Sequence, residues 1–136
     1  MSKVEIYCNY KPSYYDPPEI ICLQTAGKHN TAYFIINPNH PKGYEVKLPC
    51  KHLGEHEEKL KDYPFFMRVC SNSVVNLNHV RGLGKENVIE FKLPFFKEEI
   101  YLDTDLYKQF REKMKLVSAM LFQLSYGLQD AIVLVA

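Results

Sequence analysis

The sequence predicts a mainly β domain of small antiparallel sheets, an elongated β architecture with one short central helix and one longer C-terminal helix. The 136 residues are 46% hydrophobic and 13% aromatic, which suffices for one ordinary hydrophobic core. Short apolar runs separated by polar stretches recur along the chain. Apolar residues follow helical spacing in only two places, so the remaining elements are predicted to be strands.

Residues 1–19 are predicted to form an N-terminal arm that packs along the domain. This stretch contains Pro12, Pro17 and Pro18 together with several tyrosines. Proline lacks a backbone N–H, so we expect the prolines to prevent regular strand pairing. The tyrosine rings favour contact with a surface.

Three strands are predicted between residues 20 and 48. The apolar runs 20–23 and 33–36 are joined by a polar, glycine-containing loop, which is typical of paired strands. Prolines and a glycine interrupt residues 37–43, and residues 44–48 then alternate between apolar and charged side chains. This alternation indicates a half-buried strand.

A short helix is predicted within residues 50–63, because Leu53, His56 or Glu57, and Leu60 recur at helical spacing before Pro64. Two short apolar strands follow, on either side of a polar turn. The next predicted elements are a turn at 85–87, an alternating strand at 88–93 and a strand at 100–102.

The last helix is predicted from an apolar stripe that begins after three capping candidates. The candidates are Asp103, Thr104 and Asp105, and the stripe consists of Leu106, Phe110, Met114 and Val117. Residues 117–136 form an apolar extension, which polar residues interrupt too often for a membrane span. We expect this extension to pack against a second copy of the chain, giving a homodimer, or against the N-terminal arm.

Charge and cysteine content limit the classes of partner and compartment. The net charge of +1 creates no general attraction to polyanions. Residues 27–51 contain four lysines and one glutamate, and residues 65–85 contain three basic residues and no acid, so each stretch carries +3. The four cysteines form no C-x-x-C pair, and we expect free thiols in a cytoplasmic protein.

Catalytic and metal sites have little support. No nucleophile elbow, phosphate-binding loop or dinucleotide motif occurs, so we expect neither an enzyme nor a cofactor. His52 and His56 are four residues apart on the predicted helix, but the Leu53–Leu60 stripe favours a structural interpretation and no metal site. A metal or thiol sensor using these histidines or Cys70 is the weakest alternative.

Residues 65–80, FFMRVCSNSVVNLNHV, resemble the signature of LytTR-type DNA-binding domains. The matching positions are Phe66, Arg68, Val69, Val74, Val75, Asn76 and Val80. The order of the predicted elements over residues 20–116 resembles that family too, so the sequence is interpreted as a diverged, free-standing LytTR-like DNA-binding domain. The resemblance implies loops that enter successive major grooves of double-stranded DNA, usually as the output module of bacterial response regulators.

The resemblance and the charge pattern together give candidate DNA contacts. Lysine and arginine neutralise phosphates, whereas asparagine, serine and histidine can read base edges. Asn76 is expected to bond to backbone inside the fold. The DNA-contact candidates are Lys28, His29, Asn30, Arg68, Ser71, Asn72, Lys85, Lys108 and Arg111.

The sequence departs from the family pattern at positions that the resemblance implies contact DNA. Cys70, Ser71 and Asn72 stand where the family has His, a basic residue and Ser, and 103–105 replaces a serine and basic stretch with two aspartates. Carboxylates repel phosphates. The first hypothesis is therefore a transcriptional regulator that binds DNA, and the alternative is a protein-interaction module that has kept the fold and lost DNA binding. An unidentified regulatory protein partner fits either hypothesis.

Overall fold

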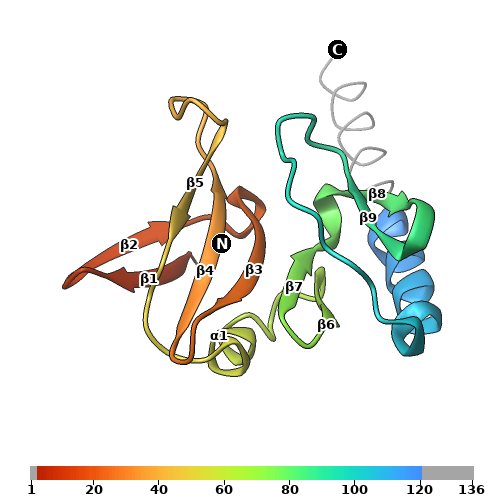
Figure 1. Ribbon diagram of the computed structural model, residues 1–136, viewed down its shortest axis with the longest axis horizontal. Helices are drawn as coiled ribbons and strands as arrows, with labels where there is room; N and C mark the ends of the chain where they lie inside the picture. Colours follow the sequence, from red (N-terminus) through yellow and green to blue (C-terminus); the bar gives the residue numbers. More distant parts are fainter. Residues whose placement is uncertain (1–2, 121–136) are drawn as a thin grey trace, which may run out of the picture.

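The computed structural model describes residues 3–120, which form three antiparallel sheets and two α-helices (Figure 1). A five-stranded sheet of order β5-β4-β3-β7-β6 lies between two two-stranded ribbons, β1-β2 and β8-β9. The strands are β1 Val4–Cys8, β2 Lys11–Tyr15, β3 Ile20–Ala26, β4 Asn30–Ile36, β5 Tyr44–Lys47, β6 Phe66–Cys70, β7 Ser73–Asn76, β8 Val80–Leu83 and β9 Ile89–Phe91. Helix α1 is Leu53–Lys59, and the C-terminal helix covers residues 107–120 of the described chain. The predicted fold class is confirmed.

The N-terminal segment forms a regular β-ribbon, so the expectation that its prolines prevent pairing is wrong. Strands β1 and β2 pair from Val4 opposite Tyr15 to Cys8 opposite Lys11, with Pro12 paired in register. Proline is tolerated here because each strand of a two-stranded ribbon has an unpaired edge. The ribbon packs along the domain as predicted, since Val4 and Ile6 are buried in the core.

The five-stranded sheet carries a hydrophobic cluster on each face. A bulge in β3 between Ile20 and Cys22 breaks the alternation of side chains. Ile21 and Cys22 therefore both join one cluster, whereas Ile20 and Leu23 join the other. Burial on both faces explains why this strand is an unbroken apolar run in the sequence.

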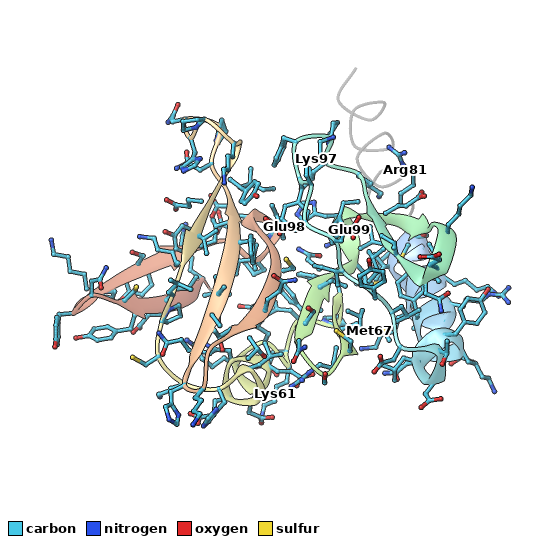
Figure 2. All side chains as sticks on the ribbon, in the orientation of Figure 1. Lys61, Met67, Arg81, Lys97, Glu98 and Glu99 are labelled. Atoms are coloured by element: carbon cyan, nitrogen blue, oxygen red, sulfur yellow. The ribbon has the colours of Figure 1, made fainter. Side chains whose placement is uncertain are left out.

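The C-terminal helix covers one face of the sheet and helix α1 supports the other. Met67, on the side of β6 that faces the C-terminal helix (Figure 2), lies in the same cluster as Phe110 and Val117. Leu53 and Leu60 place α1 in the second cluster, together with the β1-β2 ribbon. Both helical stripes predicted from the sequence are thus confirmed.

The segment between β8 and the C-terminal helix is less regular than predicted. Strand β9 spans only Ile89–Phe91, and the predicted strand 100–102 is reduced to a single bridge between Val88 and Tyr101. Within residues 3–120 no helix is long and apolar enough to cross a membrane. Most of the predicted dimerisation segment, residues 121–136, lies outside the described residues.

Candidate nucleic-acid interface

The turn between β3 and β4 presents the first group of candidate contacts. Gly27 adopts φ +75°, a left-handed conformation that favours glycine and lets the chain reverse within three residues. Lys28 and His29 are exposed at the tip of the turn. Asn30 is half-buried and begins β4, where it also bridges to Cys50. Lys28 and His29 are therefore the side chains that the turn offers to a partner.

The turn between β6 and β7 lies beside the β3-β4 turn. Gln24 of β3 pairs with Ser73 of β7, and the Thr25 N–H donates to the Asn72 carbonyl oxygen at 2.9 Å. Ser71 and Asn72 are exposed at this turn. Both turns therefore project from the same end of the five-stranded sheet, the lower end in Figure 1.

Arg68 stabilises the β6-β7 turn by linking it to helix α1. Its Nη1 donates to the Ser71 carbonyl oxygen at 2.7 Å. Its Nε and Nη2 donate to Glu57 Oε1 of α1 at 3.3 and 3.0 Å. All three nitrogens of the guanidinium group are engaged within the protein, which favours a positioning role over direct contact with a partner.

Asn76 anchors the other end of β7 inside the core. Its side-chain amide donates to the carbonyl oxygens of Ile20 at 2.9 Å and Pro17 at 3.4 Å. Its Oδ1 accepts from the Asn78 N–H at 2.9 Å. Asn76 is fully buried, so the predicted backbone-bonding role is confirmed.

Lys51 and His52 belong to the same end of the sheet, although the sequence analysis did not include them among the DNA contacts. Thr31 Oγ1 donates to the Lys51 carbonyl oxygen at 3.0 Å. The rings of His29 and His52 pack edge to face with centroids 5.4 Å apart. Lys51 and His52 are both exposed. The sequence signal was a basic pair at the start of the predicted helix, but its position depends on a contact between distant segments.

The other three candidates lie apart from this end of the sheet. Lys85 is exposed at the turn of the separate β8-β9 ribbon, on the right of Figure 1. Lys108 and Arg111 are exposed on the C-terminal helix, and the Arg111 guanidinium lies 5.8 Å from the centre of the Tyr107 ring. These cations could meet only a ligand that extends beyond the two adjacent turns.

Two exposed carboxylates lie at the start of the C-terminal helix, which is bonded to β6 near the β6-β7 turn. The Asp103 N–H donates to the Val69 carbonyl oxygen at 2.9 Å, which fixes the start of the C-terminal helix beside β6. Asp103 and Asp105 are both exposed. Negative charge therefore lies next to a turn whose exposed side chains, Ser71 and Asn72, are neutral.

His56 is a structural residue of the core. Its Nε2 donates to the Cys50 carbonyl oxygen at 2.7 Å, so Nδ1 of the neutral ring accepts from the Tyr33 hydroxyl at 2.7 Å. Within residues 3–120 no group of three or more His, Cys, Asp or Glu side chains could hold a metal ion.

The buried His56 predicts a pH dependence of stability. Burial lowers its pKa below 6.5, and Lys59 and Lys51 add to this shift while the hydrogen bond to Cys50 opposes it. The unfolded chain takes up a proton more readily, so this contribution is complete above about pH 6.5 and is lost as the pH falls. Urea unfolding between pH 7.5 and 5 should show declining stability, with a shallower decline in His56→Gln. The exposed-site control His40→Gln should lose stability with falling pH as the parent does. If His56→Gln also declines as steeply as the parent, His56 is not the origin of the pH dependence.

The comparisons with known proteins identify the fold. No protein-family model matches the sequence, and no curated protein sequence matches it. Among solved structures, the chain is similar to the LytTr DNA-binding domain of a response regulator from Bacillus cereus, with a TM-score of 0.61 and 16% sequence identity. The match covers 84% of this chain and 97% of that one. The chain therefore has a LytTR-like fold, as the resemblance of residues 65–80 predicted.

Proposed function

Since the chain folds like a LytTr DNA-binding domain, we propose that it is a sequence-specific transcriptional regulator that contacts the major grooves of double-stranded DNA through its turns. It acts in the cytoplasm and has no catalytic activity or cofactor. The β3-β4 turn supplies Lys28 and His29, and the β6-β7 turn supplies Ser71 and Asn72. Asn30 and Arg68 support these turns from within the sheet.

One observation carries this proposal: two exposed turns are bonded side by side at one end of a rigid sheet. The hydrogen bond between Thr25 and Asn72 fixes their spacing, and the sheet behind them is buried on both faces. Loops held on a rigid scaffold can bring base-reading side chains into a groove without a recognition helix. Lys28 supplies a phosphate contact next to Asn72, which can read a base edge.

The outlying cations fit contacts to the DNA backbone. Lys85, Lys108 and Arg111 lie beyond the sheet, along the length of the domain. Phosphate contacts at a distance from the base-reading turns fix the orientation of a protein on the duplex. We therefore assign these three residues to phosphates and not to bases.

The experiment that tests the proposal is a fluorescence-anisotropy titration of the full chain with duplex DNA at two salt concentrations. Affinity in the micromolar range or tighter that falls steeply with salt supports the regulator, because phosphate contacts release counterions. Absence of binding at low salt overturns it. A subsequent selection from random duplexes would identify the preferred sequence.

Arg68 gives a prediction that separates positioning from phosphate contact. We expect Arg68→Gln to weaken DNA binding by about three- to tenfold, because the carbonyl of Ser71 loses its partner and the turn loosens. The slope of log affinity against log salt should stay unchanged, since no phosphate contact is lost. A slope reduced by about one unit would instead place the guanidinium on a phosphate.

A second candidate function is a protein-interaction module that has lost DNA binding. The observation that favours it is the pair of exposed carboxylates, Asp103 and Asp105, at the start of a helix bonded to β6, near a turn whose exposed side chains are neutral. If the first function holds, replacing both aspartates with asparagine should strengthen DNA binding by removing repulsion of phosphates. If the variant and the parent both fail to bind at low salt, the interaction module remains.

We also propose that residues 117–136 mediate dimerisation. Val117 packs in the core of the domain, and the exposed Leu116 and Met120 lie on the same helix. We expect the full chain to be a dimer by light scattering and a chain ending at residue 117 to be a monomer. A full-length chain that is itself monomeric, or a truncated chain that stays dimeric, would dispose of this role.

A further inference from the structure

A pocket of about 750 Å³ lies between the β1-β2 ribbon and the segment that joins β5 to α1. We call it the ribbon pocket. One wall comes from the ribbon, including Tyr7 and Tyr10, and the opposite wall includes Leu48 and Pro49. Tyr7 and Leu48 are 54% and 50% exposed. The volume falls in the range of pockets that hold small organic molecules, and large apolar side chains line it.

The pocket also contains two ammonium groups and a single acid. Lys51 and Lys59 line it together with Glu5. Within the described part of the chain, neither lysine forms an ion pair with a carboxylate. Lys59 Nζ instead donates to the backbone carbonyl oxygen of Glu5 at 2.6 Å. The two lysines therefore outnumber the single acid in the lining of the pocket.

The two lysines also act on each other and on the wall of the pocket. Burial lowers the pKa of Lys59, an effect that Glu5 opposes and Lys51 strengthens. Lys59 and Lys51 likewise contribute to the lowered pKa of His56. Repulsion between cations in a partly buried site is relieved when an anion binds between them.

The pocket walls are held in place by long-range hydrogen bonds. The carbonyl oxygens of Pro49 and Lys51 accept from Thr31, and that of Cys50 accepts from His56. Lys59 ties α1 to the ribbon across the pocket. A preformed site loses little ordering entropy when a ligand binds.

We propose that the ribbon pocket binds a small organic anion, with an apolar body against Tyr7, Leu48 and Pro49 and a carboxylate or phosphate group between Lys51 and Lys59. The apolar walls select the body and the two lysines select the charge. Both ring nitrogens of His56 are already engaged, so it forms part of the wall and does not bond to the ligand. This site borders the proposed DNA interface, since Asn30 and Lys51 also line the pocket, but ligand binding can be tested without DNA.

The test uses Cys50, an exposed thiol in the pocket wall, as the reporter. The full chain is alkylated with neutral iodoacetamide, and the rate at each cysteine is followed by mass spectrometry. We expect phenyl phosphate to slow alkylation of Cys50 in a saturable manner and to leave Cys70 unaffected. Benzylamine, which has the ring with the opposite charge, should not protect Cys50. Inorganic phosphate, which lacks the ring, should protect it more weakly.

Two lysine variants and a matched control complete the test. Lys51→Gln and Lys59→Gln should each raise the concentration of phenyl phosphate needed for half protection by about tenfold, because each removes a charged contact. Lys61, just past the end of α1, is paired with Glu58 and lies outside the lining of the ribbon pocket, so Lys61→Gln should leave this concentration unchanged. Because Lys59 also bonds to the ribbon, Lys51→Gln is the decisive variant if Lys59→Gln unfolds.

The proposal is overturned if phenyl phosphate gives no saturable protection at millimolar concentrations, if benzylamine protects equally, or if Lys51→Gln behaves like the parent. None of these outcomes bears on DNA binding, which the anisotropy titration tests separately.

Discussion

Asn76→Ala should lower the free energy of unfolding by about 3 kcal/mol. The side chain is fully buried and makes three hydrogen bonds to backbone groups of residues 17, 20 and 78. Alanine leaves these backbone groups with fewer partners in a region that water does not reach, and an unsatisfied buried group costs about 1–3 kcal/mol. Urea unfolding followed by circular dichroism measures the change, with an unchanged m-value if the native state is intact.

The control for this prediction is Asn78→Ala. Asn78 is two residues away and half-buried, and only its backbone N–H takes part in the network described for Asn76. Its replacement should change stability by less than about 0.5 kcal/mol. Similar losses at the two positions would mean that the Asn76 network does not anchor β7.

The double substitution Lys28→Glu and Ser71→Glu should weaken DNA binding by about a hundredfold at low salt. Each change places a carboxylate on one of the two adjacent turns, where the proposed duplex lies, and about tenfold is expected from each. Loss of the lysine contact should also reduce the salt slope by about one unit. Anisotropy titrations at several salt concentrations measure both quantities.

A matched control changes the charge by the same amount elsewhere. Lys97 lies at the upper edge in Figure 2, away from the two turns, and Asn39 is exposed in the β4-β5 loop, at the opposite end of the five-stranded sheet. Lys97→Glu combined with Asn39→Glu also alters the net charge by three units. It should weaken binding by less than about threefold. Equal losses of DNA affinity in the two double variants would indicate that binding responds to net charge and that the two turns do not form a localised interface.

The fold was predictable where local patterns decide it. The spacing of Leu53 and Leu60, and that of Phe110 and Val117, gave both helices because each stripe packs on a sheet face. The β1-β2 ribbon was missed because Pro12 was expected to prevent pairing. A proline disrupts a strand only where a backbone N–H is required for a hydrogen bond to a neighbouring strand, and each strand of a two-stranded ribbon has one unpaired edge. The predicted strand at 100–102 is reduced to one bridge with Val88, because Glu86 and Asn87 just before Val88 adopt left-handed conformations that end the extended segment.

The candidate site was predictable only in part. The exposed turns were expected from their glycine and short polar residues, but their adjacency depends on the pairing of β3 with β7, which follows from no local signal. The partner of Arg68 is Glu57 on a different element, so its positioning role required coordinates. Lys51 and His52 were missed for the same reason, since Thr31 holds them beside the β3-β4 turn.

The measurement that tests the central claim most directly is amide chemical-shift mapping of the isotopically labelled chain with duplex DNA at low salt. If the two adjacent turns lie in the groove, the largest perturbations should occur together at residues 27–30 and 71–72, and the amide of Lys97 should stay unchanged. Perturbations that centre on the Lys97 edge, or that include one turn without the other, would contradict the account.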